Sequence, residues 1–543
     1  MRRILQVFYV FFSAIIVSVA IQNEFISFGS PFLGLFALVP LYLALRNSKS
    51  YKESSLLTGL QVILVHLFSS FWLGNFQDFA IFTLGGSALA TGVIGMAFGL
   101  LLHFVIALTD NENAGLESSS WFTVERVLMF AAIWTLYEWT KSNGFLAYPW
   151  GTILMTAYKW PVLTQIVSIT GVWGLSFLLS LFSAVIGEGI ALIPSAHPGN
   201  RKNCFYAYKY CGAFCIVLFC FTGVYGALEY TKERTPVKNM DTVLVQQNID
   251  SWLTTDKNVI DISTKLTKAG VDECISETGS KPDLVVWSEA VLSYAFPDAI
   301  NYYTKRPKGN PLIPFIQETG VPFVIGAPFT LDKRNQQYGN SAILFDANGE
   351  FNGFFAKMHL VPFAEVIPGM EHEWVRNLLK KVVGISSGWT PGKYLTMFDI
   401  PLKNGDSVKI STPICFEDAF PALCRPFYNL GSEVFVNLTN DSWSLTKSAE
   451  YQHFVIASYR AIEYRTTMLR STNSGYTVVV NPVGKVIADL PLFEEKYLYA
   501  SVPVYERTKT TYSVFGDWLP LVCGIAFLWL SIKAYIMQKK ENQ

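Results

Sequence analysis

Four long stretches of this 543-residue sequence contain no Asp, Glu, Lys or Arg: residues 54–77, 79–109, 160–187 and 210–228. A helix needs roughly 20 residues to cross a hydrocarbon core of about 30 Å, so each stretch is long enough to span a membrane. Shorter or interrupted apolar runs at 4–22, 31–45, 127–143 and 517–537 also qualify, although Glu138 and Lys141 interrupt the third. The sequence therefore predicts a multi-pass α-helical membrane domain with eight spans.

Charge separates this apolar part of the chain from a polar part. Residues 1–228 hold only 20 of the 84 charged residues, and the rest follow. We expect a seven-span transmembrane domain at 1–230, a globular domain at 235–508 and an eighth transmembrane helix at 517–537. The formal net charge is zero, which gives no reason to expect a nucleic-acid partner.

Positive charge predicts how the spans are oriented, because Lys and Arg favour cytoplasmic loops. The N-terminus is predicted to lie in the cytoplasm, because this places the positive charges of Arg2, Arg3, the loop 46–52 and the tail 539–543 on the cytoplasmic side. Lys141 and Lys159 are exceptions to this charge rule. Seven crossings then place the polar domain on the outer face. The first apolar run lacks a small-residue cleavage site, so we expect it to remain as an uncleaved anchor.

Three of the eight cysteines, Cys274, Cys415 and Cys424, fall in the polar domain. In an oxidising compartment an odd count leaves at least one thiol unpaired. A bridge between Cys274 and Cys424 with Cys415 free is one arrangement that the sequence leaves open. No Cys/His cluster has the spacing of a zinc site, so no metal is expected.

The polar domain has the pattern of a layered α/β fold. Short β-rich runs alternate with helical candidates, and the strands are apolar enough to be buried. The predicted strands are 242–248, 283–288, 322–327, 341–346, 352–356, 408–414, 433–439 and 476–480. The predicted helices are 257–278, 311–319, 418–430 and 445–465.

Polar side chains follow four of these predicted strands directly. They are Glu289, Lys357, Cys415 and the pair Asn440 and Asp441. Ligand sites of layered α/β folds collect just past strand ends, so we expect these groups to share a site. For each residue alone the ordinary alternative is a buried core cysteine or a solvated turn residue.

The sequence also contains several distinctive motifs: WSEA (287–290), KMHLVPFAEVIPG (357–369), PICFED (413–418), LTNDSW (438–443), LRSTNSG (469–475) and, in the membrane part, EWTKSNGFLAYPWG (138–151). Together they resemble the motifs of the apolipoprotein N-acyltransferases, a membrane-bound branch of the nitrilase superfamily. The resemblance covers nearly the whole chain. It implies a nitrilase-like αββα sandwich inserted between the last two of eight spans.

The resemblance also implies a catalytic triad. Glu289 matches the general base, Lys357 the residue that stabilises the oxyanion and Cys415 the nucleophile. Glu365 and Glu417 match two further acids of the family, expected to support the site.

Three positions depart from the family pattern. Phe416 stands where tyrosine is common, Ser288 stands where proline usually precedes the glutamate, and Trp252 is offset from a family tryptophan. We expect residues 370–389 to form either a lid that dips into lipid or an amphipathic helix that packs on the domain's own core. Five apolar residues of this segment recur at helical spacing: Trp374, Leu378, Leu379, Val382 and Val383.

The activity implied by the resemblance is a two-step acyl transfer without a cofactor. A phospholipid donates a fatty acyl chain to the cysteine, and the N-terminal amine of a diacylated apolipoprotein accepts it. A monomer in the bacterial inner membrane is expected, with its catalytic domain on the periplasmic face. Two alternatives remain at this stage: a membrane-tethered amidase that hydrolyses a small amide, and a non-catalytic sensor or transporter.

Overall fold

The computed structural model describes residues 1–76, 80–109, 116–192, 201–250, 253–306, 308–309, 311–366, 369, 372–374, 377 and 388–541. The chain forms two compact units. The first contains Met1–Lys232, Thr446–Tyr459 and Thr510–Gln543, and the second contains Glu233–Leu445 and Arg460–Lys509.

The first unit is helical. Its helices α4 and α5 pack closely because small residues line their contact: a Cβ on Gly99 would lie 2.7 Å from the Ser54 carbonyl oxygen. The elements are α1 (Arg2–Ala20), α2 (Pro31–Phe36), α3 (Val39–Arg46), α4 (Tyr51–Ser69), η1 (Phe71–Asn75), η2 (Ile81–Gly86), α5 (Ser87–Thr109), α6 (Leu116–Lys141), η3 (Ile153–Lys159), α7 (Pro161–Thr164), α8 (Val167–Thr170), α9 (Trp173–Leu192), α10 (Arg201–Thr231), α17 (Thr511–Phe515) and α18 (Trp518–Glu541).

Five helices in the described residues are long and apolar enough to cross a membrane: Arg2–Ala20, Thr83–Thr109, Trp173–Leu192, Tyr208–Thr231 and Trp518–Ile536. The other three predicted spans correspond to α2 with α3, to α4 and to α6, which are shorter or carry more polar residues. A multi-pass helical membrane domain is therefore confirmed, and the total of eight spans stays a prediction.

The charge-free stretch 160–187 contains most of a helix of membrane-spanning length, but that helix does not fill the whole stretch. This stretch contains the short helices α7 and α8, and the long helix begins only at Trp173. Gly171 ends α8 with φ of 66°, a conformation that glycine adopts readily and that cannot continue a helix. A Cβ at this position would also lie 2.4 Å from the Tyr512 ring.

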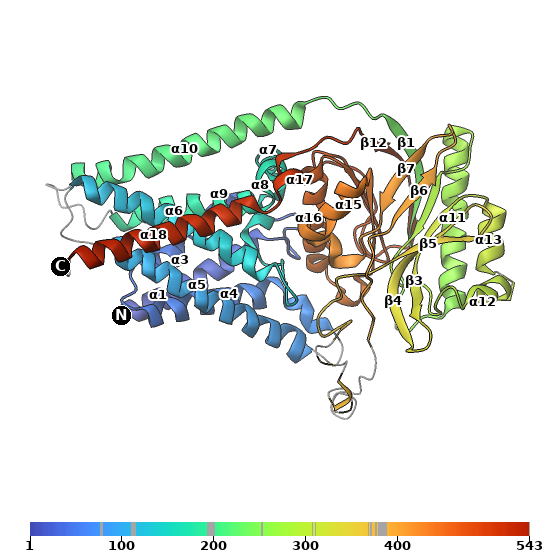
Figure 1. The fold of residues 1–543 in the computed structure, drawn as a ribbon, viewed down its shortest axis with the longest axis horizontal. Helices are drawn as coiled ribbons and strands as arrows, with labels where there is room; N and C mark the ends of the chain where they lie inside the picture. Colours follow the sequence, from blue (N-terminus) through green and yellow to red (C-terminus); the bar gives the residue numbers. More distant parts are fainter. Residues whose placement is uncertain are drawn as a thin grey trace. The chain divides into compact units, whose positions relative to one another are not determined.

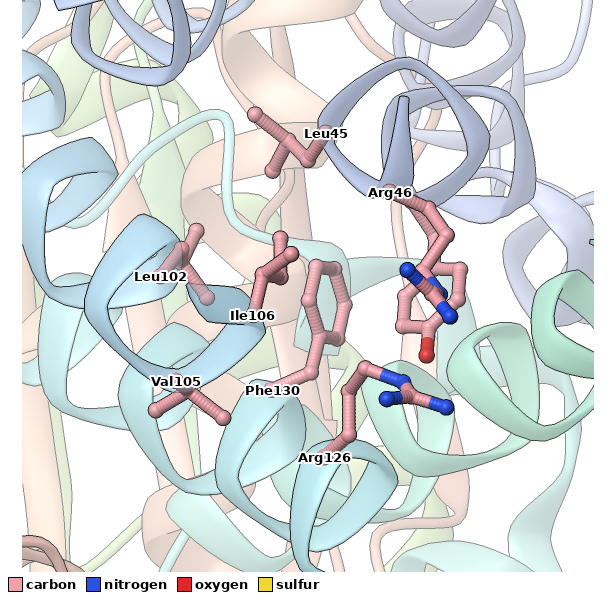
Figure 2. Close-up of a pocket in the computed structure, with 8 residues that line it drawn as sticks. Leu45, Arg46, Leu102, Val105, Ile106, Arg126 and Phe130 are labelled. Carbon is pink, nitrogen blue, oxygen red and sulfur yellow. The ribbon is translucent and has the colours of Figure 1, made fainter. Parts of the chain in front are cut away.

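A cluster of charges is buried between α3, α6 and α9 of this unit. Figure 2 shows Arg46 and Arg126 on one side of a small pocket whose other lining residues are mostly apolar. The fully buried carboxylate of Glu188 accepts hydrogen bonds from Arg126 Nε at 3.1 Å and from the Tyr42 hydroxyl at 2.5 Å, and Arg46 Nε lies 3.6 Å from it. The two guanidinium groups thus share one carboxylate inside the protein, and such pairing is how charges persist in a membrane interior.

Replacing Glu188 with glutamine is expected to destabilise the protein, because the buried Arg126 guanidinium and the partly buried Arg46 guanidinium would lose their shared counter-charge. Breaking a buried ion pair by removing one partner costs roughly 3–5 kcal/mol. The free energy of unfolding in detergent micelles checks this, with the exposed Glu506→Gln as the control expected to change little. An unchanged free energy of unfolding in Glu188→Gln would contradict the assigned role.

The second unit contains two six-stranded sheets. The first has the order β12-β1-β2-β3-β4-β5 and the second the order β11-β10-β9-β8-β7-β6. The strands are β1 (Lys238–Gln246), β2 (Leu284–Trp287), β3 (Phe323–Asp332), β4 (Gln337–Phe345), β5 (Phe351–Ala356), β6 (Met397–Pro401), β7 (Ser407–Ser411), β8 (Val434–Thr439), β9 (Thr467–Thr472), β10 (Val478–Val480), β11 (Val486–Asp489) and β12 (Lys496–Val504).

Helices cover the outer faces of the two sheets. The helices of the second unit are α11 (Asp256–Thr278), α12 (Ile300–Lys305), α13 (Leu312–Thr319), η4 (Cys415–Ala419), α15 (Pro421–Leu430), η5 (Ser442–Ser444) and the end of α16 (Lys447–Tyr464), most of which belongs to the first unit. Figure 1 shows α11 and α13 outside the first sheet and α15 outside the second. Between the sheets, Ser471 Oγ of β9 donates to the Val286 carbonyl oxygen of β2 at 3.2 Å. The predicted αββα sandwich is confirmed.

The centre of each sheet is parallel, and this arrangement gathers strand ends. β1, β2 and β3 are parallel neighbours, as are β7, β8 and β9. Parallel strands end at the same edge, where ligand sites form. All eight predicted strands and all four predicted helices of this domain are present, and the sequence missed β6, β9, β11, β12 and α12.

Candidate active site

Glu289 follows β2 and contacts groups from two other strand ends. Its Oε1 accepts from Lys357 Nζ at 3.3 Å, and its Oε2 accepts from the backbone N–H of Asn440 at 2.8 Å. The chain passes close to β3 here, because a Cβ on Gly326 would lie 2.6 Å from Glu289 Cα. The structure thus brings together the residues that follow β2, β5 and β8, as the strand-end pattern predicts.

Lys357 follows β5 and is completely buried. Its ammonium group contacts two carboxylates, Glu289 at 3.3 Å and Glu365 at 2.9 Å. Glu365 is itself held in place, since its Oε2 accepts the backbone N–H of Val361 at 2.8 Å. Glu365, predicted to support the site, therefore lies beside the Lys357 ammonium.

Cys415 begins the short helix η4 immediately after Ile414, which bridges to β8 at Leu438. Its φ of 52° is unusual for a residue with a side chain and marks a tight turn. The Asn437 amide holds this turn, donating to the carbonyl oxygens of Pro413 at 3.0 Å and Cys415 at 2.9 Å. A buried cysteine on a sharp, externally braced turn is well placed to present its sulfur in a fixed direction.

The charges of Cys415, Glu289 and Lys357 influence one another's pKa values. Burial raises the pKa of the Cys415 thiol well above its ordinary value, the charge of Glu289 raises it further, and Lys357 opposes both. Burial alone would lower the pKa of Lys357, but the negative charges at Cys415, Glu289 and Glu365 outweigh burial and raise it well above its ordinary value. Lys357 is therefore an ammonium ion, and Cys415 keeps its proton until a base accepts it.

Burial also raises the pKa of Glu289, an effect that Lys357 reduces and that Glu365 reinforces. A carboxylate with a raised pKa accepts a proton more readily than an ordinary one. The same surroundings that keep the Cys415 thiol protonated thus make Glu289 a stronger base.

Glu417 holds two segments of the site together through hydrogen bonds to backbone N–H groups. Its carboxylate accepts the backbone N–H groups of Met358 at 2.8 Å, His359 at 3.0 Å and Ile414 at 2.8 Å. These bonds connect the segment after Lys357 to the residue before Cys415. Burial outweighs them and raises the pKa of Glu417 to about 7.

Phe416, where the family commonly has tyrosine, packs beside the ammonium group. Lys357 Nζ lies 5.3 Å from the centre of the Phe416 ring, within the range of a cation–π contact. The ring also packs against His359 and Phe420, with centroids 5.3 Å and 5.1 Å away. Phe416 therefore forms an apolar wall of the site.

Other predictions fall outside the described residues. Trp252 and the lid positions Leu378, Leu379, Val382 and Val383 are among them. Of the predicted lid, Trp374 is described and is 69% exposed.

Sequence reasoning missed two groups that shape the site. Asn340 in β4 donates to both Glu289 and Glu365. Arg470 in β9 forms a buried ion pair with Asp418, three residues after the cysteine. Asn340 lies inside a strand, where nothing in the sequence separates it from a structural residue. Arg470 lies in TMLRST (467–472), whose hydroxyl residues hide the strand, so the sequence does not mark this charge as buried.

The bridge considered between Cys274 and Cys424 is absent. Both thiols are free and fully buried, and the Cys415 thiol is also free. Cys274 lies on α11, where its thiol approaches the Ser280 carbonyl oxygen at 3.3 Å, whereas Cys424 lies on α15, where its thiol approaches the Glu417 carbonyl oxygen at 3.9 Å. Their helices cover different sheets, so the two sulfurs have no route to each other.

Comparison with known proteins identifies both units. Residues 13–185 match the model of the apolipoprotein N-acyltransferase N-terminal domain, and residues 244–512 match that of the carbon-nitrogen hydrolases. The chain is 44% identical to apolipoprotein N-acyltransferase 2 of Treponema denticola, over 100% of this chain and 99% of that protein. It is 38% identical to apolipoprotein N-acyltransferase 2 of Treponema pallidum (98% and 95% covered) and 31% identical to apolipoprotein N-acyltransferase of Borreliella burgdorferi (98% and 96% covered). The 44% identity extends along the full length of both chains. The chain therefore belongs to the apolipoprotein N-acyltransferase family.

Proposed function

We propose that this membrane protein moves a fatty acyl chain from a phospholipid to the N-terminal amine of a diacylated apolipoprotein, through a thioester on Cys415. The observation that carries the proposal is the buried cluster of Lys357, Glu289 and Glu365 beside the braced Cys415 turn. A thiol, a base and a fixed positive charge are the parts that acyl transfer needs.

The first step forms the thioester. Glu289 accepts the Cys415 proton while the sulfur attacks the ester carbonyl carbon, so that a C–S bond forms. Lys357 has three N–H donors, and two of them serve the carboxylates, which leaves the third for the oxyanion. The C–O bond then breaks, and the proton passes from Glu289 to the departing oxygen. Lysophospholipid leaves.

The second step uses the same groups. The free amine attacks the thioester carbon, and Glu289 accepts the amine proton. The C–N bond forms, the C–S bond breaks, and the proton returns to the sulfur. The net reaction exchanges an ester for an amide, with no oxidant, reductant or cofactor required.

The helical unit suits substrates that are themselves anchored in a bilayer. Each acyl CH₂ group drawn into water costs about 0.8 kcal/mol, so an enzyme in the membrane avoids a large penalty. The distribution of Lys and Arg supports a location in the bacterial inner membrane with the second unit on the periplasmic face. One chain supplies every residue of the proposed site, so we expect the monomer to be active.

The experiment is to mix purified full-length protein with phospholipid vesicles and a synthetic diacylated lipopeptide. We expect lysophospholipid and N-acylated lipopeptide to appear in equal amounts, and no lysophospholipid to accumulate beyond one per enzyme when the lipopeptide is omitted. Hydrolysis of small amides with no release of lysophospholipid would contradict the proposal and favour an amidase.

A further inference from the structure

Asn340 is buried in β4, with 2% of its surface exposed, and contacts both carboxylates of the site. Its Nδ2 donates to Glu289 Oε1 at 2.7 Å and to Glu365 Oε1 at 3.2 Å. Ionised carboxylates only accept hydrogen bonds, so the amide nitrogen must be the atom that faces them. The β4–β5 pairing fixes its place, because the Asn340 carbonyl oxygen accepts the backbone N–H of Lys357 at 2.8 Å.

The two carboxylates and the single ammonium leave the site with an excess of negative charge. Glu289 and Glu365 share Lys357, and Asp441 adds a further negative charge that acts on Glu289. Like charges in a buried site favour protonation of one member. A protonated Glu289 would be useless as a base, so something besides Lys357 must favour its ionised form.

We propose that Asn340 is a positioning residue for the catalytic base: its two N–H groups hold the Glu289 and Glu365 carboxylates apart and keep Glu289 ionised and aimed for proton transfer. This inference rests on the proposed role of Glu289. Neutral donors suit this task because they satisfy both carboxylates without adding a charge that would compete with Lys357.

The surroundings of Glu289 support the proposal. It faces Lys357 after β5, Glu365 in the turn 361–366, Asp441 after β8 and Cys415 in η4. Burial and the negative groups raise its pKa, whereas Lys357 and the Asn340 hydrogen bond lower it. Loss of the amide therefore moves this pKa upward.

The test measures the rate of Cys415 acylation against pH in the full-length Asn340→Leu variant, with phospholipid vesicles as the donor. Leucine keeps the approximate size and removes both donors. A hydrogen bond to a charged group contributes enough to change a rate roughly 10- to 100-fold, so we expect acylation to slow by that factor near neutral pH. The acidic limb of the pH profile should move up by about one unit. The KM for phospholipid should stay unchanged, because Asn340 holds the base and not the lipid.

Two further variants sharpen the result. Asn340→Asp replaces the donors with a third carboxylate, whose negative charge raises the pKa of Glu289 further, so its acidic limb should move to higher pH than that of Asn340→Leu. Ser341→Ala is the matched control, since Ser341 is the next buried residue of β4 and its hydroxyl donates only to the Gly339 carbonyl oxygen. Its rate and pH profile should equal those of the unaltered protein.

The possible outcomes separate this inference from the proposed function. An unaltered protein that forms no acyl adduct would refute the proposed function itself. The other outcome is that the unaltered protein forms the acyl adduct and the acidic limb of Asn340→Leu does not shift. The acylation rate of the variant is then either normal or reduced only in proportion to its folded fraction. Either result overturns the role of Asn340 and leaves the proposed function standing.

Discussion

Replacing Cys415 with alanine is expected to abolish acyl transfer, lowering lysophospholipid release by roughly 10⁴-fold or more. Among the described residues of the site, Glu289 and Lys357 pair with each other at 3.3 Å and Glu365 pairs with Lys357 at 2.9 Å, which leaves Cys415 as the group proposed to form the covalent intermediate. Loss of a nucleophile removes the whole two-step route, so the effect exceeds that of any supporting residue. Release of lysophospholipid from vesicles over time measures it.

The matched control for this variant is Cys274→Ala. Cys274 is a free and fully buried cysteine of the same domain, on α11. Its replacement should leave the rate nearly unchanged, which separates loss of the nucleophile from loss of a buried thiol. Activity that survives in Cys415→Ala would remove the proposed mechanism.

Replacing Glu289 with glutamine is expected to give the second largest loss, about 10²- to 10⁴-fold in the acylation rate. Glutamine keeps the size of the side chain but cannot accept the thiol proton. It would also turn an amide N–H₂ toward donors that now serve the carboxylate, namely Lys357 Nζ, Asn340 Nδ2 or the backbone N–H of Asn440. Single-turnover acylation kinetics measure the loss, and thermal unfolding in detergent shows whether the fold is kept.

The pH dependence of the unaltered protein tests the same residue. As the proposed base, Glu289 can accept a proton only when ionised, and burial raises its pKa above the ordinary carboxyl value. Acylation should therefore fall as the pH drops through this raised pKa, at a higher pH than an ordinary carboxyl group, near 4.3, would give. The limb should disappear in Glu289→Gln. If Glu289→Gln keeps the acidic limb of the pH profile, another group must be the one whose titration produces that limb.

The central residues of the site were predictable because each follows a recognisable strand. The runs before Glu289, Lys357 and Cys415 are apolar and β-rich, and parallel strands bring their ends to one edge. The motif resemblance added the roles, which the strand pattern alone cannot supply.

Contacts between distant strands were not predictable from the chain. Asn340 meets Glu365 only because β4 pairs with β5 and the turn after Lys357 folds back. The Cys415 turn depends on Asn437 in β8 and on the ion pair of Asp418 with Arg470. Such contacts depend on sheet order, which periodicity does not reveal.

The missed elements have local reasons. β6 and β11 are edge strands of the second sheet, and β9 contains Arg470 and several hydroxyl residues that weaken its apolar pattern. The stretch 160–187 has no charge to mark its break, yet Pro161 and Gly171 divide it into short helices before α9. Hydropathy measures whether a segment can enter a membrane, and it does not locate where a helix begins.

The most direct test is the intact mass of the full-length protein after exposure to phospholipid vesicles without an acceptor. The mechanism predicts a mass increase of one fatty acyl chain, located on Cys415, removed by neutral hydroxylamine and transferred when a diacylated lipopeptide is added. An N-acylated lipopeptide that forms without any such adduct, or an adduct located on another residue, would contradict the thioester mechanism.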